Sequence, residues 1–364
     1  MKIKVAREKF LKALQRVNSI VGSRTMLPVL GNVLLKAEEN TLSLTATDLE
    51  VRITTSLEAE VSATGETTLP SRKLLALVNC FTAQELEIDV NENHHAAIRC
   101  GSSHFKLLGL GPEDFPSMTE FETVREFKTK EADFKRMLGM ISYAVSAEDS
   151  RKALTGVLVS TNDNTLTLVA TDGKRLAMQE KNLEFVEGAA GEAIVPIKAV
   201  NELKRLLEGE NVLTVKIGEK QCRFESTNFV LTSKLVEGNY PSYRLVIPQS
   251  FTRTVEVNAA KLLSKIETVA QVLSDSSSYI ILSFEENALK LQASSTEVGE
   301  GSDLVDIEYT SDPISVSFNP SFLADPLKNC GVEKIRVKIN DELNPVAIEG
   351  DEGFLYVIMP IRKR

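Results

Sequence analysis

Thr41-Leu-Ser-Leu-Thr-Ala-Thr-Asp48 recurs 124 residues later as Thr165-Leu-Thr-Leu-Val-Ala-Thr-Asp172, and these two stretches decide the fold. A weaker third copy follows at Ala288-Leu-Lys-Leu-Gln-Ala-Ser-Ser295. Apolar residues alternate with other residues in each copy, which is typical of a β-strand with one buried face. Self-similarity at a near-constant period predicts a chain built from repeated structural units.

A second set of strands has the same period. It consists of Leu86-Glu-Ile-Asp-Val90, Leu213-Thr-Val-Lys-Ile217 and Ile335-Arg-Val-Lys-Ile339, spaced by 127 and 122 residues. Between the two strand sets, each copy has a helical pattern that opens near a proline, and the openings are Pro70-Ser71, Pro196-Ile197 and Asn319-Pro320. Another helix is expected near the start of each copy, around residues 7–20, 131–144 and 259–273.

These repeats predict an α+β fold of three tandem, structurally equivalent domains, each with two helices packed on antiparallel sheets. The expected domains are residues 1–124, 125–250 and 251–364, because proline-containing segments around Pro116 and Pro241 precede the second and third copies. No Gly/Ser-rich linker separates them, so we expect rigid packing. Three chance resemblances between strand-rich windows are the alternative.

The composition excludes several classes of protein. The 364 residues are 43% hydrophobic and 26% charged, and they contain no apolar run long enough for a membrane span. The first 25 residues do not resemble a secretory signal, so we expect a cytoplasmic protein. Four scattered cysteines, without a C-x-x-C pair, are expected to be reduced and structural.

The net charge of −9 is unusual for a DNA-binding protein, but the charge is unevenly distributed. The six expected helices carry about +7 by our count of ionisable residues, which leaves about −16 for the rest. Lys9, Lys12 and Arg16 fall on one face of the first helix. If successive helices turn inward and a partner completes a circle, they would line a hole for a polyanion. Ordinary solvated helix faces are the alternative.

Longer stretches resemble a known family, the beta subunit of bacterial DNA polymerase III, the replicative sliding clamp. The resemblance covers residues 1–364 and is clearest in four segments: Arg24-Thr-Met-Leu-Pro-Val-Leu-Gly-Asn32, Ala170-Thr-Asp-Gly-Lys-Arg-Leu-Ala177, Asn239-Tyr-Pro-Ser-Tyr-Arg244 and Tyr356-Val-Ile-Met-Pro-Ile-Arg362. It implies a non-catalytic homodimeric ring that encircles duplex DNA irrespective of sequence. It also implies partners: the polymerase III catalytic subunit, an ATP-driven clamp loader, and other replication and repair proteins.

The resemblance also implies functional residues. It implies four DNA-facing residues, Arg24, Arg72, Lys73 and Lys198, and the basic face of the first expected helix adds Lys9, Lys12 and Arg16. The groove expected to bind partner peptides, which carry a Gln and bulky apolar residues, consists of Arg151, Leu154, Thr171, Gly173, Arg175, Leu176, Pro241, Val246, Val357, Met359, Pro360, Ile361 and Arg362. Met359-Pro-Ile361 could instead belong to a buried last strand. The dimer contacts expected are Phe105 and Leu107 with Val272 and Leu273, which could also be core residues.

Three features depart from the family pattern. Leu245 stands where relatives commonly have Arg, which would make the peptide preference more apolar. Glu148 stands where an amide is usual near DNA, and its carboxylate would repel phosphate, so we do not include it among the DNA contacts. The basic ending Arg362-Lys363-Arg364 has no explanation in the sequence.

Enzymatic readings are weaker. Asp48 and Asp172 occupy equivalent positions, as paired catalytic carboxylates do, but the third copy has Ser295 there. A turn-capping role fits them better. His94, His95 and His104 lie near one expected hairpin, are expected to be exposed, and lack further metal ligands. No phosphate-binding glycine motif is present, so we expect no cofactor and no catalysis. A peptide-binding scaffold that never surrounds DNA remains the alternative function.

Overall fold

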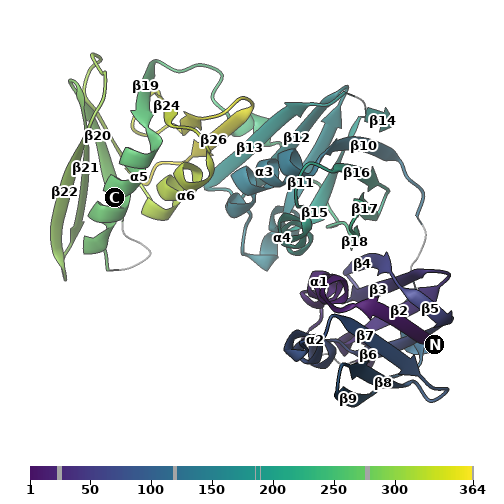
Figure 1. The fold of residues 1–364 in the computed structure, drawn as a ribbon. Helices are drawn as coiled ribbons and strands as arrows, with labels where there is room; N and C mark the ends of the chain where they lie inside the picture. The colour runs from purple at the N-terminus through teal and green to yellow at the C-terminus, as the bar shows by residue number, and fades with distance from the viewer. Residues whose placement is uncertain (23–26, 118–120, 185, 189, 275–278, 363–364) are drawn as a thin grey trace. The chain divides into compact units, whose positions relative to one another are not determined.

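The computed structural model describes residues 1–22, 27–117, 121–184, 186–188, 190–274 and 279–362 (Figure 1). Its elements repeat three times in the order strand, helix, a group of strands, helix and three strands. The strand pairs are antiparallel throughout the described sheets. The predicted α+β fold of three tandem, equivalent domains is therefore confirmed. The boundaries at residues 124 and 250 stay a prediction.

The first two repeats share the same set of elements. The first contains β1 (Lys2–Ala6), α1 (Arg7–Asn18), β2 (Asn32–Glu38), β3 (Thr41–Thr47), β4 (Val51–Glu58), β5 (Glu60–Ala63), β6 (Gly65–Pro70), α2 (Ser71–Cys80), β7 (Glu85–Val90), β8 (His95–Cys100) and β9 (Ser103–Leu108). The second contains β10 (Arg125–Lys130), α3 (Glu131–Ile141), β11 (Gly156–Asn162), β12 (Thr165–Thr171), β13 (Arg175–Asn182), β14 (Val186–Gly188), β15 (Gly191–Pro196), α4 (Ile197–Leu206), β16 (Val212–Ile217), β17 (Gln221–Glu225) and β18 (Val230–Lys234).

The third repeat has the same plan, without a counterpart of β5 and β14 among the strands described. It contains β19 (Arg253–Asn258), α5 (Ala259–Val269), β20 (Ile280–Glu285), β21 (Ala288–Ser295), β22 (Gly299–Asp306), β23 (Ile314–Phe318), α6 (Pro320–Asn329), β24 (Lys334–Ile339), β25 (Val346–Glu349) and β26 (Phe354–Ile358). The three copies that revealed the repeat are thus β3, β12 and β21.

The helices begin where the sequence predicts. The side chain of Asn319 caps α6, with Oδ1 accepting hydrogen bonds from the backbone N–H groups of Ser321 (2.9 Å) and Phe322 (3.4 Å). On α1, Phe10, Leu14 and Val17 form a buried apolar stripe, and Leu11 is only half-buried because it lies at the edge of that stripe. Figure 1 shows α5 and α6 packed side by side in the third repeat.

Residue contacts group the chain into two compact units, because sheets continue from one repeat into the next. The first unit is Met1–Ala132, Phe185–Ala189 and Lys198–Leu235, and the second is Asp133–Glu184, Ala190–Ile197 and Val236–Arg364. In the first unit, β18 of the second repeat pairs with β4 of the first. In the second unit, β26 of the third repeat pairs with β13 of the second. We call these two strand pairs the repeat junctions.

Among the strands at the ends of the sheets, two are equivalent to strands that form the repeat junctions. β9 closes the sheet β5-β1-β7-β8-β9, and β22 closes the sheet β22-β21-β20-β23. By element order, β9 is equivalent to β18 and β26, and β22 is equivalent to β4 and β13. The strands that form a junction in the other repeats are therefore both sheet edges here.

The structure also tests two smaller expectations. All four cysteines are free, as predicted, but Cys80 is exposed at the end of α2 and is not a core residue. His94 and His95 are half-buried, contrary to the expected exposure, because a tight turn holds them. Asn91 Oδ1 accepts the His95 N–H (3.0 Å), and the carbonyl of His94 accepts the Gly109 N–H (3.0 Å). Across the described residues, the helices are too short or too polar to cross a membrane.

Candidate peptide groove and basic helix faces

The cationic residues predicted to face DNA lie on helices of the first unit. By our count, α1 carries a net charge of about +3, and α2 and α4 carry about +2 each. Lys9, Lys12, Arg72 and Lys73 are exposed, while Arg16 is half-buried. The apolar face of α1 packs on α2, β3 and β4, so its basic face remains outward from this core. Arg24 lies outside the described residues.

Several of these cations already have partners within the unit. Lys9 Nζ lies 2.7 Å from Glu58 Oε2, Arg16 Nη2 lies 3.9 Å from Glu208 Oε2, and Lys198 pairs with Asp48. Arg72 donates to the carbonyl of Val21 (3.0 Å). The Lys9–Glu58 pair is exposed on both sides and therefore weak, so it leaves Lys9 able to contact another anion.

The predicted peptide groove lies within the second unit and has an apolar floor. Leu176 and Val357 face each other across the junction of β13 and β26 and are each 2% exposed. They belong to one core cluster that also contains Tyr243. Leu154, in the segment before β11, is buried as well. The floor is therefore fixed by the same packing that joins two repeats.

A tight turn between β12 and β13 forms one side of the groove. Gly173 has a φ of +85° there, a conformation that glycine adopts without strain. Thr171 Oγ1 accepts the Gly173 N–H (3.1 Å) and donates to the carbonyl of Arg175 (2.5 Å). Asp172 Oδ1 accepts the N–H groups of Lys174 (2.8 Å) and Arg175 (3.0 Å). Asp172 is thus a turn-capping residue, as the sequence favoured, and Asp48 has the same role between β3 and β4.

The side chain of Arg175 is only 10% exposed. Its Nε donates to Asp172 Oδ2 (3.1 Å), its Nη1 to Asp325 Oδ2 (2.5 Å) and its Nη2 to the carbonyl of Tyr143 (2.7 Å). Burial is the largest single influence and lowers the pKa of Arg175, but the hydrogen bonds and charges of Asp325, Tyr356 and Asp172 together outweigh it and leave the pKa raised. The guanidinium also lies 4.3 Å from the ring centre of Phe322 on α6. Arg175 therefore supports the groove from beneath and ties it to α6.

Arg151 lies over the turn. A side chain at Gly173 would meet Arg151 Nη1 at 2.7 Å, so the end of the flexible Arg151 side chain would have to move if Gly173 were replaced. Arg151 Nη2 is held by Glu148 Oε2 at 3.2 Å. Glu148 is one of the residues that depart from the family pattern, and it partly neutralises a predicted groove cation. The spacing of three residues between them was visible in the sequence, but its consequence was not.

Several residues of the predicted groove are exposed, and most of these are apolar. Val246 is 45% exposed and Met359 is 44% exposed, and Pro241 and Arg362 are also exposed. Met359 follows the end of β26 at Ile358, so it is not part of a buried last strand. Pro360 and Ile361 are half-buried. Leu245, the other departure from the family pattern, is 86% exposed.

The predicted dimer residues lie at the two sheet edges. Phe105 on β9 is 43% exposed, with its ring centre 5.7 Å from that of Phe81, and Leu107 is half-buried. Val272 and Leu273 are half-buried after α5. A side chain at Gly301 on β22 would meet Val272 Cγ1 at 3.4 Å. Phe105 therefore lies on one of these edges and Val272 borders the other, and neither is a core residue.

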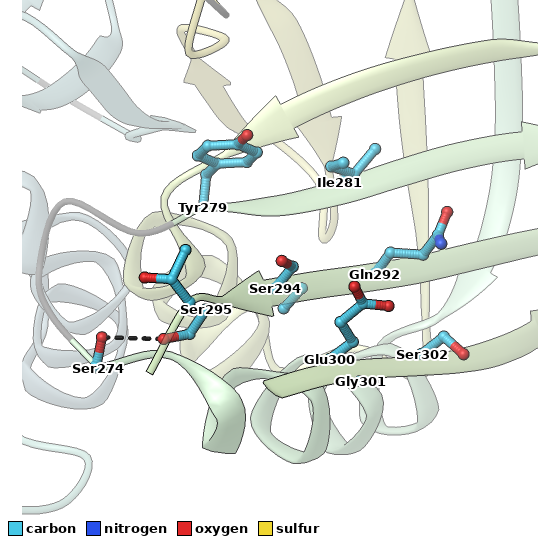
Figure 2. A pocket seen from close by; sticks show the side chains of 11 residues that line it. Ser274, Tyr279, Ile281, Gln292, Ser294, Ser295, Glu300, Gly301 and Ser302 are labelled. Carbon is cyan, nitrogen blue, oxygen red and sulfur yellow. Dashed lines mark hydrogen bonds between the residues drawn. The ribbon is translucent and has the colours of Figure 1, made fainter. Parts of the chain in front are cut away.

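A hollow of about 740 Å³ lies along β21 and β22 (Figure 2). Gln292, Glu300 and Ser302 line it, and Ser274 Oγ lies 3.2 Å from Ser295 Oγ at one end. Among the described residues, no cluster of His, Cys, Asp or Glu side chains could hold a metal ion.

Comparison with known proteins matches the whole chain. Models of the N-terminal, central and C-terminal domains of the DNA polymerase III beta subunit match residues 1–119, 128–242 and 244–362. The beta sliding clamp of Chlamydia muridarum is 34% identical, over 100% of this chain and 99% of that protein. The DNA polymerase III beta subunit from Pseudomonas aeruginosa is 33% identical with a TM-score of 0.96, and its griselimycin-bound structure is 33% identical with a TM-score of 0.95. Both structures are covered completely, as is this chain. The chain therefore belongs to the bacterial DNA polymerase III beta subunit family, the sliding clamps, which are processivity factors without catalytic activity of their own.

Proposed function

We propose that two copies of this chain close into a ring around duplex DNA and hold the replicative polymerase on it. The observation that carries this proposal is the pair of open sheet edges, β9 and β22. In both repeat junctions, the strand equivalent to β9 pairs with the strand equivalent to β22. An open edge exposes unpaired backbone groups and is a template for another strand. If two copies join head to tail, β9 of each copy pairs with β22 of the other, and the two contacts form a closed ring.

The repeat junctions also supply a register for this contact. Ile358 lies opposite Arg175 in one junction, and Ser233 lies opposite Val51 in the other. The equivalent residues at the open edges are Leu107 and Gly299, which follows from the pairing within each sheet. The same register places Lys106 opposite Glu300 of the second copy and Phe105 opposite Gly301.

Side-chain chemistry supports this register. Lys106 and Glu300 are both exposed and carry opposite charges, and opposite charges facing each other across strands are stabilising. Gly301 leaves space beside Val272 for the ring of Phe105. Phe105 already lies on the face of its sheet that is covered by helices, because its ring packs near that of Phe81, which follows α2. In Figure 2, Glu300 projects from β22 on the side that borders the hollow.

DNA binding is proposed for the basic faces of α1, α2 and α4. Their cations are spread over three helices and partly paired with acidic side chains, so they would attract phosphate without gripping one site. Weak attraction combined with topological closure permits sliding. The negative charge of the remaining chain would discourage nonspecific contact from outside.

The groove of the second unit is proposed to take peptides from the polymerase III catalytic subunit, the clamp loader, and other replication and repair proteins. Its buried floor and exposed apolar rim suit bulky apolar side chains. Arg175 would hold the floor in place, and Arg151 and Arg362 would lie nearer the peptide. The related P. aeruginosa clamp bound to griselimycin shows that a member of this family accepts a ligand. A role in replication places the protein in the cytoplasm.

Retention on circular DNA tests the proposal. The protein is loaded by its clamp loader onto a nicked circular plasmid, and the plasmid is then cut once. We expect the protein to remain on the circle and to leave the linear form. Equal retention on both forms would show a scaffold that does not surround DNA, and would refute encirclement.

A further inference from the structure

The turn between β3 and β4 reproduces the turn that borders the peptide groove. Thr47 Oγ1 accepts the Leu49 N–H (3.1 Å) and donates to the carbonyl of Val51 (2.9 Å). Asp48 Oδ1 accepts the N–H groups of Glu50 (3.0 Å) and Val51 (2.8 Å). These four hydrogen bonds match those of the turn between β12 and β13. The first unit therefore contains a second copy of the frame that supports the groove.

The surroundings of this turn are equivalent too. The Lys234 N–H donates to the carbonyl of Glu50 (2.9 Å), as the Met359 N–H donates to the carbonyl of Lys174 (3.0 Å). Pro116 borders the turn as part of a hollow of about 320 Å³ that also includes Leu49, Arg52 and Lys234. All of these residues belong to the first unit. The frame thus encloses a space, although its side chains differ from those of the groove.

Leu49 has a strained backbone conformation that packing within its own repeat does not explain. Its φ is +78°, whereas glycine occupies the equivalent position of the other turn with a φ of +85°. A side chain with a Cβ atom costs free energy in this conformation. Leu49 is nevertheless 44% exposed, so little packing in the chain itself offsets that cost. Strained residues that persist without a packing reason cluster at binding sites.

The cations beside Leu49 have no acidic partner. Arg52 is half-buried, donates to the carbonyl of Pro116 and lies 5.6 Å from the ring centre of Phe115. No carboxylate of the described residues forms an ion pair with Arg52 or with the exposed Lys234. Burial lowers the pKa of Arg52, as expected for a guanidinium without a counter-ion. Glu50 also lines the hollow but is not paired with Arg52.

We infer that this hollow is a second partner site, which binds an acidic peptide segment by placing a carboxylate on Arg52 and Lys234 and an aliphatic side chain on Leu49. A carboxylate would supply the counter-ion that the half-buried guanidinium lacks. An aliphatic neighbour would cover Leu49, which phosphate could not do. The site differs from the peptide groove in its demand for negative charge, and it would act whether or not the groove binds peptides.

Methyl NMR of the full-length protein, labelled with ¹³C at leucine and valine methyl groups, tests this inference. The probe is the synthetic peptide acetyl-Asp-Leu-Leu-Asp-amide, and the comparison peptide replaces both Asp residues with Asn. We expect the acidic probe to shift the Leu49 signals saturably and the Asn peptide to bind about tenfold more weakly or worse. Arg52→Met and Leu49→Asn should each weaken the probe by about tenfold.

Matched controls separate binding from folding. Leu343→Asn alters another exposed leucine outside both sites and should leave the probe affinity unchanged. Leu49→Asn suits the turn, because Asn tolerates a positive φ, so its melting temperature should not fall. The inference would be overturned by no shift at Leu49 up to millimolar probe, by equal binding of the two peptides, or by shifts confined to Leu176 and Val357. The inference would also be overturned if duplex DNA displaced the acidic peptide and the Asn peptide from this hollow equally well.

Discussion

The proposed ring makes a quantitative prediction about one pair of charges. In the register inferred from the repeat junctions, Lys106 faces Glu300 of the second copy. A favourable charge pair across strands is worth about 0.2–1 kcal/mol, and like charges are destabilising by a similar amount. Lys106→Glu exchanges attraction for repulsion, so each contact should lose about 0.4–2 kcal/mol. The ring contains the contact twice, so the dimer should lose about 0.8–4 kcal/mol.

This loss corresponds to a dimer Kd raised by about fourfold to several hundredfold, because 1.4 kcal/mol is a factor of ten. Glu300→Lys should have the same effect, and the double variant should restore most of the original affinity. Sedimentation equilibrium at two salt concentrations measures the Kd, and the difference between variants should shrink at high salt because the charges are exposed.

Glu297→Lys provides the matched control. Glu297 is exposed and carries the same charge, but it precedes β22 and has no place opposite Lys106 in this register. It should not rescue Lys106→Glu. Rescue by Glu297→Lys as strong as that by Glu300→Lys would refute the register, and a Kd unchanged by the single substitutions would refute the strand pairing itself.

Four further outcomes follow from the structure. Arg175→Met should lower the free energy of unfolding by about 3 kcal/mol in urea titrations, because it leaves the half-buried carboxylates of Asp172 and Asp325 without their largely buried cation; an unaffected stability would contradict the role beneath the groove. Met359→Ser should weaken an apolar polymerase peptide by about tenfold in fluorescence anisotropy, with little change in stability. Lys12→Ala should reduce the salt dependence of DNA association by a slope of about 0.9 for each lost phosphate contact. The hydrogen bond from Lys265 lowers the pKa of Asp303 below 3.8. Asp303→Asn should therefore be less stable than the parent protein at neutral pH, and this difference in the free energy of unfolding should disappear as the pH falls below 3.8.

The repeated strands could be predicted from the sequence because their signal is local. Alternation of apolar residues in Thr41–Thr47 determines which face is buried, and the pattern recurs with little change in Thr165–Thr171. Helix starts were equally local, since a cap such as Asn319 acts within one turn. Residue-by-residue likeness to the family added the groove and the dimer edges, which no short pattern contains.

Long-range partners could not be predicted in this way. Arg175 appears in the sequence as one more polar groove residue, but its burial depends on Asp325, 150 residues away. Glu148 seemed important for DNA repulsion, whereas in the structure it holds Arg151. The positive φ of Leu49 was also hidden, because leucine rarely adopts it and the comparison with Gly173 requires the backbone.

The repeat junction accounts for the main features of the chain. Where a last strand of one repeat meets the fourth strand of another, backbone pairing holds the repeats together and the adjoining turn shapes a surface. In the second unit the surface is apolar, because Leu176 and Val357 form its floor. In the first unit, Arg52 and Thr232 occupy the corresponding positions in the paired strands, so the surface is polar and cationic. The equivalent strands β9 and β22 remain open edges, with Glu300 at the corresponding position on β22. Because side chains at the repeat junction can change while its backbone pairing is kept, the same geometry can carry the proposed peptide groove, the proposed acidic-peptide site and the proposed contact between copies.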